Sequence, residues 1–336
     1  MKQPFASCAR PAPAISCPEA YLKSGATITM SHVPKSLPRF EAALISIPRK
    51  LARAAAICLC GALLGACSMG QMVARSSLPI LESGNVAMNR ETDLDLARAA
   101  IPANLKLIEG LIQELPGNAD LRLQAAQGFY GYAYGFVEDE DSRRASGLYR
   151  RGWEHARQAL AASGFQDDLT AMTTEELKRQ LAELGRRAVP ALFWSASCWA
   201  KWIDMNRNDP ARIADMGKAA ALMERVLDLD ENYYHGGAHL FFGVFYGARP
   251  PMLGGDFERS ARHFEKARAL THGKLLLVDM LQAEYLARQQ LDRKQFHERL
   301  IAVVNAPPDI YPEMALVNAI AQQKAGRLLA KEEEWF

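Results

Sequence analysis

The sequence lacks several features that would point to a metal or thiol site. Its 336 residues include six cysteines, and only Cys67 and Cys198 lie at or beyond position 67. No disulfide framework can be read from the chain, and no CxxC pair with metal-ligand spacing is present. Cys198 lies in an aromatic segment, where we expect a small buried side chain rather than a nucleophile. The sequence predicts no metal and no cofactor.

Motifs for catalysis and nucleotide binding are also missing. The chain has no GxSxG and no HExxH, and no Lys-Ser or Lys-Thr follows Gly254 and Gly255 as a phosphate loop would require. His235 and His239 are four residues apart and could hold zinc from one helix face, with His263 nearby. Histidines that face a groove or cap a helix are the simpler interpretation. We therefore predict no catalytic residues and no enzymatic activity.

Charge excludes another class of partner. The formal net charge is +2, but residues 1–66 hold eight Lys/Arg and two Asp/Glu, so the rest of the chain carries −4. No basic patch interleaved with aromatic residues is present, and we predict no nucleic-acid partner. The acidic run from Glu138 to Asp141 lacks the spacing of an EF-hand and is expected to be a solvated loop.

The amino-terminal segment has the pattern of a signal peptide. Arg49, Lys50 and Arg53 precede a short apolar run over 54–66. A membrane span needs about 20 apolar residues, so this run is short for one. The alternatives are a plain signal peptide without lipidation and a short transmembrane anchor. Residues 1–29 make a long lead, and Met30 is a second candidate start.

The end of this segment, Leu64-Gly65-Ala66-Cys67, resembles the bacterial lipobox. The resemblance implies cleavage before Cys67 and lipidation of its thiol, which would anchor the protein to a membrane. Ser68 rather than Asp follows, which by analogy favours outer-membrane sorting. We predict a leader over 1–66, a tether over 67–90 and one domain over 91–336.

Helical periodicity dominates the predicted domain. Apolar residues recur at spacings of three and four, and no β-branched run alternates with period two. Pro and Gly clusters separate the helices at short intervals, which predicts an all-α fold of antiparallel hairpins. The predicted helices cover about 94–115, 119–136, 141–163, 174–189, 191–206, 210–228, 233–247, 257–270, 274–290, 293–305 and 312–330.

A weak repeat suggests that these hairpins are of the tetratricopeptide (TPR) type, stacked as a short α-solenoid or bundle. Three helices carry small and bulky residues at spacings of four and three, so that each trio shares one face. The trios are Ala219, Met223 and Val226; Ser260, Phe264 and Ala267; and Ala145, Tyr149 and Gly152.

Aromatic residues are dense in three segments of the predicted domain. Most should be core, but glycines between the rings leave space beside them, which predicts an aromatic groove for a ligand or partner segment. The candidate groove residues are Tyr130, Tyr134, Trp194, Trp199, Trp202, Tyr234, Phe241, Phe245, Tyr246 and Arg249.

The glycine-rich stretch Gly247–Gly255 is predicted to join two antiparallel helices beside this groove. Pro250 and Pro251 stop the first helix. Gly254 and Gly255 allow a positive φ and close packing. Asp256 is placed to cap the next helix.

Two segments together resemble the T component of TRAP transporters (the TatT family), which are periplasmic TPR-like lipoproteins. They are "YYHGGAHLFFGVFYGARPPMLGGDFERSARHFEKA", from Tyr233, and "NAIAQQKAGRLLAKEEEWF", from Asn318. The resemblance implies an all-α fold, no known enzymatic activity, and a partnership with the solute-binding P subunit. It also implies a groove for a small hydrophobic ligand, and it is compatible with homo-oligomers. The matching motif positions are Cys67, Gly236, Gly237, Pro250, Gly254, Gly255, Asp256 and Asn318.

Two alternatives stay open at this point. The chain could be a general TPR scaffold for protein–protein interactions in the envelope, without ligand transport. It could instead be an enzyme with a metal at His235 and His239. The sequence names neither the ligand nor the face that meets a partner.

Overall fold

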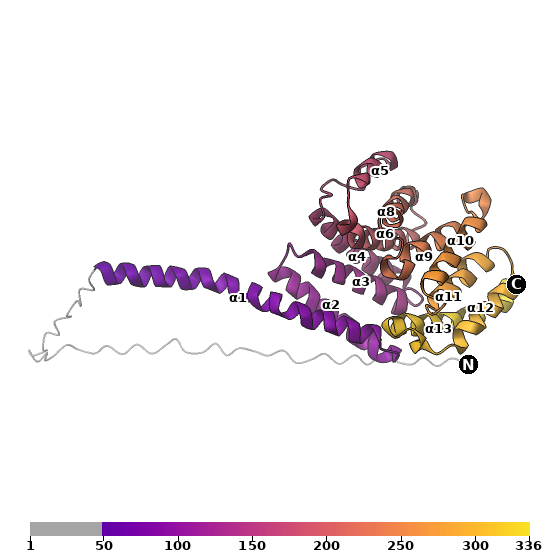
Figure 1. Cartoon of the computed structure of the whole chain (residues 1–336), viewed down its shortest axis with the longest axis horizontal. Helices are drawn as coiled ribbons and strands as arrows, with labels where there is room; N and C mark the ends of the chain where they lie inside the picture. The colour runs from indigo at the N-terminus through magenta and orange to yellow at the C-terminus, as the bar shows by residue number, and fades with distance from the viewer. Residues whose placement is uncertain (1–48) are drawn as a thin grey trace, which may run out of the picture. The chain divides into compact units, whose positions relative to one another are not determined.

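The computed structural model describes the backbone of residues 49–336 and the side chains of residues 69–336, and this part of the chain consists of helices and the turns and loops between them, without strands (Figure 1). The predicted all-α fold is therefore confirmed. The elements are α1 Arg49–Asn89, α2 Leu94–Glu114, α3 Ala119–Phe136, α4 Ser142–Ala162, α5 Thr174–Ala182, η1 Arg186–Ala188, α6 Val189–Asp204, α7 Pro210–Ala214, α8 Met216–Asp230, α9 Tyr233–Gly247, η2 Pro251–Leu253, α10 Phe257–Leu270, α11 Leu277–Gln282, η3 Ala283–Ala287, α12 Arg293–Asn305, η4 Pro308–Ile310, η5 Pro312–Met314, α13 Ala315–Leu329 and α14 Glu332–Trp335.

Short polar residues start the helices at the predicted places. Asn118, Asp141 and Asp256 each accept a hydrogen bond of 2.9 Å from a backbone N–H three residues further on. A side-chain acceptor there satisfies one of the free N–H groups of the first turn. The prediction that Asp256 is an N-cap is confirmed.

Two predicted helices are interrupted. The expected helix over 210–228 consists of α7 and α8, which meet at Asp215. The expected helix over 274–290 begins as α11 and continues as η3, a π-helical turn over Ala283–Ala287. Wider π turns are often found at functional sites, and this one carries Tyr285.

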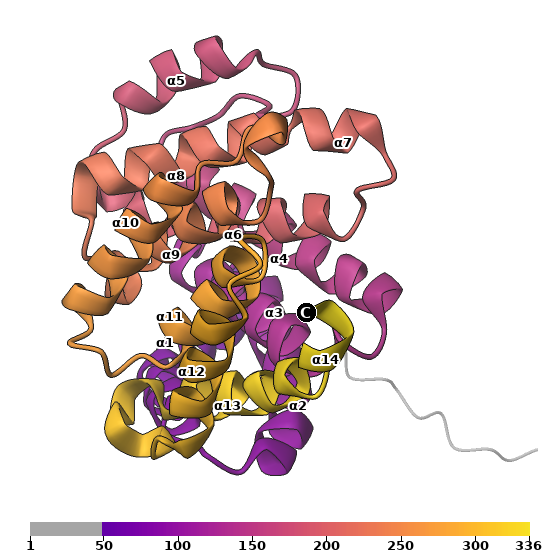
Figure 2. The ribbon, with the colours of Figure 1, turned by 90° about the vertical axis from the view of Figure 1, so that its right-hand side faces the viewer.

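Neighbouring helices in the chain pack on one another. α2 contacts α3, α3 contacts α4, α4 contacts α6, α6 contacts α8, and α9 contacts α10. The chain then returns, since α13 contacts α2 (Figures 1 and 2). The three residue trios are all buried at these crossings. That burial is compatible with TPR-like hairpins, whereas the repeat itself stays a prediction.

Residues 58–336 form one compact unit. The segment expected to be a tether, 67–90, is helical as far as Asn89, and Ala74 and Leu81 are buried against α2 and its neighbours. The side chain of Cys67 lies outside the described residues, as do Met30 and most of the predicted leader. No helix in the described part of the chain combines the length and the hydropathy needed to cross a membrane.

Candidate functional site

A cavity of about 620 Å³ lies among α1, α2, α3, α6, α9 and the C-terminal helices, where the three hydrophobic clusters meet. Its size is typical of small-molecule sites, which cover roughly 300–1,000 Å³. Most of its wall is aromatic and aliphatic. The exposed wall residues Ile213 (48%) and Leu253 (65%) indicate that it opens to solvent beside α7 and η2.

The structure brings seven of the ten candidate groove residues together in this wall. Tyr130 and Tyr134 stack on each other along α3, and Tyr130 meets Trp194 of α6 edge-on. Trp194 in turn meets Tyr234 of α9 at a ring-centroid distance of 4.9 Å. The seven wall residues are Tyr130, Tyr134, Trp194, Tyr234, Phe241, Phe245 and Arg249.

The other three candidates lie outside the wall of the cavity. Trp199 and Trp202 share the face of α6 that meets α4, and each stacks on Trp153 at 5.2 Å. Trp199 is fully buried. Tyr246 points to the opposite side of α9, where it stacks on Phe242. Helical spacing predicted the aromatic helices but did not separate their two faces.

Charged residues that the sequence analysis missed lie at one end of the cavity. Lys201, Asp204 and Arg207 contribute to its wall beside Arg249 and Tyr285. The signal for Lys201 was present in the sequence, since it follows Trp194 by seven residues and so shares its helix face.

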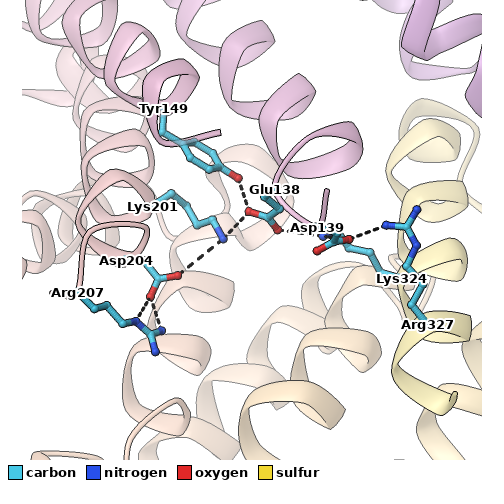
Figure 3. A network of polar contacts seen from close by, with 8 residues as sticks. All are labelled: Glu138, Asp139, Tyr149, Lys201, Asp204, Arg207, Lys324 and Arg327. Carbon is cyan, nitrogen blue, oxygen red and sulfur yellow. Dashed lines mark hydrogen bonds and ion pairs between the residues drawn. The ribbon is translucent and has the colours of Figure 1, made fainter. Parts of the chain in front are cut away.

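Lys201 belongs to a buried ionic network centred on Glu138 (Figure 3). The Glu138 carboxylate lies 2.7 Å from Nζ of Lys201 and 2.9 Å from Nζ of Lys324, and it accepts a hydrogen bond of 2.6 Å from the Tyr149 hydroxyl. Glu138 and Lys324 are only 9% and 8% exposed. Lys324 also contacts Asp139 at 2.9 Å. The expectation of a solvated acidic loop is therefore wrong at Glu138.

The ionisation of this network follows from its contacts. Burial works against the charged form of Glu138, but Lys201 and Lys324 outweigh it and hold the pKa of the carboxyl below its usual value. Burial likewise opposes the charge of Lys201, but Glu138 and other acidic neighbours hold the Lys201 pKa well above its usual value. Both groups are therefore charged at neutral pH.

A second carboxyl near the network behaves differently. Glu284 lies on the π turn η3, and no hydrogen bond or ion pair to it is present among the described side chains. Burial raises its pKa, although Lys324 and Lys201 act in the opposite direction. The cavity wall therefore lies beside one firmly ionised carboxylate and one that resists ionisation.

The start of α9 has an unusual backbone at the wall of the cavity. Tyr234, His235 and Gly236 have φ values of 47°, 58° and 74°, in the left-handed region. This conformation costs a residue with a side chain about 1–2 kcal/mol, so the surrounding contacts must hold it. The Tyr234 hydroxyl accepts a hydrogen bond of 3.2 Å from Gln127, and Nδ1 of His235 lies 2.6 Å from the Tyr311 hydroxyl.

The two glycines of this turn are needed for close packing. A Cβ on Gly236 would lie 2.9 Å from Leu270, and its positive φ also disfavours a side chain. A Cβ on Gly237 would lie 2.6 Å from the ring of Phe193. Gly237 and Phe193 both line the cavity, so this motif shapes its wall.

The proline–glycine turn after α9 positions Arg249. Pro250 has an extended backbone, and Gly254 has a φ of 83°. A Cβ on Gly255 would lie 1.8 Å from the carbonyl oxygen of Arg249, so only glycine fits there. The turn thus carries Arg249 and Leu253 to the cavity wall, as expected of a rigid hairpin beside the groove.

Asn318, the last motif position, is buried and holds two loops to α13. Its Oδ1 accepts a hydrogen bond from Leu276 N at 2.9 Å, and its Nδ2 donates to the carbonyl oxygens of Lys274 and Pro308. All its polar atoms are used within the chain, so its place in the motif is structural.

The described histidines do not gather into a group that could hold a metal ion. His239 and His263 share a hydrogen bond between their Nδ1 atoms at 2.9 Å, whereas His235 contacts Tyr311 instead. Burial, with His239 next to it, lowers the pKa of His263 to about 4. Among the described side chains, no group of three His, Cys, Asp or Glu residues could hold a metal ion. Burial also raises the pKa of Cys198.

Helices that surround an apolar cavity with aromatic side chains in its wall have the usual build of a small-molecule site. In the comparison with known families, residues 90–336 match the TRAP transporter T-component family (TAtT). The chain belongs to this family, as its motifs predicted. It is also 25% identical over 262 residues to an uncharacterized protein of Treponema pallidum (strain Nichols), an alignment that covers 73% of this chain and 81% of that protein.

Family membership assigns the chain to a class of transporter components rather than to a class of enzymes. A TRAP transporter component associates with other subunits of the transporter at the cell envelope.

Proposed function

We propose that this chain binds the solute-binding P subunit of a TRAP transporter and assists the uptake of a small hydrophobic ligand held in the cavity. The observation that supports this most is the cavity of about 620 Å³, whose wall includes seven aromatic or cationic residues expected to line a groove. A pocket of this size, mainly apolar with a few polar groups, has the usual build of a small-molecule site.

The wall is suited to binding because its rings are held in place before a ligand arrives. Trp194 is packed edge-on against Tyr130, Phe193 and Tyr234. Rigid aromatic side chains lose little conformational entropy on binding, so more of the contact energy is available as affinity. The left-handed turn at Tyr234 adds a fixed backbone to the same wall.

In this proposal the protein is a lipoprotein that faces the periplasm. Cleavage before Cys67 and lipidation of its thiol would attach the part of α1 that begins at Cys67, and the domain after it, to the membrane, with the outer membrane favoured by Ser68. The anchor would keep the domain at the envelope, where the solute-binding subunit delivers ligand.

Co-purification from the native envelope tests the partnership. The tagged full chain should retain a solute-binding protein, whereas a Cys67→Ser variant, which cannot be lipidated, should be released from the membrane fraction. If no solute-binding protein accompanies the anchored chain, the transport role is wrong.

Native mass spectrometry of the same material tests the ligand. A small molecule that stays bound supports transport, and its loss in a Phe241→Ala variant would place it in the cavity, because Phe241 is a wall residue. A chain that carries a protein partner but never a ligand would favour the general scaffold instead.

A further inference from the structure

One cation in the cavity wall has no carboxylate partner among the described side chains. The guanidinium of Arg249 donates one hydrogen bond of 3.1 Å to the carbonyl oxygen of Phe245 and lies 4.4 Å from the centre of the Phe245 ring. A guanidinium carries five N–H donors, and this contact uses one. The remaining donors are therefore free to bind a ligand.

The surroundings of Arg249 favour a negative charge. Burial, together with the nearby charge of Arg207, lowers the pKa of Arg249, which indicates that its guanidinium is partly removed from water. Arg207 lines the same cavity and has Asp204 as its partner. Of these two guanidinium groups only that of Arg207 has a carboxylate partner among the described side chains, so Arg249 leaves an uncompensated positive charge at this end.

The remainder of the wall near this cation is apolar. Phe241, Val244 and Phe245 of α9 line the cavity next to Arg249, and Leu253 and Ile213 lie at its open side. A ligand that fits both surroundings has one anionic group and an apolar body. A carboxylate suits a guanidinium best, because the two planar groups can form paired hydrogen bonds.

We propose that the cavity binds an amphipathic carboxylate, whose carboxylate contacts Arg249 and Arg207 while its apolar body lies against the aromatic wall. The inference rests on the proposed function, because it takes the cavity to be the ligand site. It adds the chemical class of the ligand and assigns Arg249 as the residue that selects it.

Three probes that share an eight-carbon chain and differ in charge separate anion selection at Arg249 from ligand binding in the cavity as such. They are octanoate, 1-octanol and octyltrimethylammonium. Binding is measured by calorimetry on the full chain in lipid nanodiscs, with empty nanodiscs as the blank. We expect octanoate to bind more tightly than either other probe. An Arg249→Gln variant should weaken octanoate by about 10- to 100-fold, as expected for a charge-assisted hydrogen bond, and leave 1-octanol unchanged.

Arg259→Gln is the matched control. Arg259 stacks on the next ring of α9, with its guanidinium carbon 4.2 Å from the centre of Tyr246, but it is exposed and does not line the cavity. This variant should bind octanoate as the unchanged chain does. An Arg249→Lys variant keeps the charge without the planar fork of the guanidinium. Its affinity for octanoate should lie between that of Arg249→Gln and that of the unchanged chain.

Two results would overturn the inference, and they differ from each other. If 1-octanol or octyltrimethylammonium binds as tightly as octanoate, and Arg249→Gln alters none of them, the cavity is a ligand site without selection for an anion. If none of the three probes binds, the cavity is not a site for such ligands, and both the inference and the proposed ligand role fail.

Discussion

Replacing Glu138 with Gln should destabilise the protein far more than its position in an acidic loop suggests. The change removes the negative charge between two buried ammonium groups, at 2.7 Å from Lys201 and 2.9 Å from Lys324. Removing one partner of a buried ion pair costs about 3–5 kcal/mol, because the other charge stays buried without compensation. For a chain of this size each kcal/mol lowers the melting temperature by about 2–4 °C, so we expect a fall of about 6–20 °C.

Glu140→Gln is the control for this experiment. Glu140 lies two residues further along the same loop and pairs with Arg98, but both side chains are well exposed, at 51% and 40%. Exposed ion pairs contribute little, so this variant should melt close to the unchanged chain. Both melting curves can be followed by circular dichroism. Equal melting temperatures for the two variants would refute the view that Glu138 is a buried, doubly paired charge.

A double-mutant cycle makes the test independent of general damage. Lys324→Met should be destabilising alone, since it removes one of the two cations held by Glu138. The combined Glu138→Gln and Lys324→Met variant should lose less stability than the sum of the two single losses, because both single changes disrupt the same contact. Strict additivity would show that the two side chains do not interact.

Three further predictions concern single positions. Burial raises the pKa of Glu284, so its folded state holds the proton more tightly and the protein loses stability as pH rises above the usual carboxyl value of 4.5. As the pH rises from about 4 to about 7, the Glu284→Gln variant should therefore gain stability relative to the unchanged chain. Urea-unfolding midpoints that change with pH in the same way for both chains would argue against this. Asn318→Ala should cost about 2–4 kcal/mol in urea unfolding and speed hydrogen exchange at Leu276, whose N–H loses its acceptor. Gly237→Ala should lower the free energy of unfolding by about 1–3 kcal/mol, because the added carbon would lie 2.6 Å from the Phe193 ring. A urea-unfolding midpoint equal to that of the unchanged chain would show that the ring moves aside freely.

Local signals account for the parts of the fold that the sequence predicted well. The bounds of α3 and α10 match the predicted ranges 119–136 and 257–270, since each is set by a capping residue, Asn118 or Asp256, and by its own apolar spacing. The family assignment also rested on local motifs. Signals of this kind act within a few residues, so one sequence is enough to read them.

Features that depend on distant contacts could not be read in the same way. Tyr234 and His235 lie in a stretch with good helical periodicity, yet packing holds both in a left-handed turn. The spacing of aromatic residues in α6 does not indicate which face of the helix packs against α4. Trp199 is therefore predicted in the groove, whereas it stacks on Trp153 of α4. The polar end of the cavity depends on pairs such as Glu138 with Lys324, which are 186 residues apart.

That separation has a consequence for the order in which the molecule can assemble. A chain made from its amino terminus presents Glu138 long before Lys324 exists, because 186 residues separate the two. Until α13 is complete, the carboxylate has only Lys201 and Tyr149 as partners, and the core around it stays open on one side. Contacts of such long range form late and slowly. Nascent or truncated chains should therefore be the form of this protein most exposed to proteases and to aggregation.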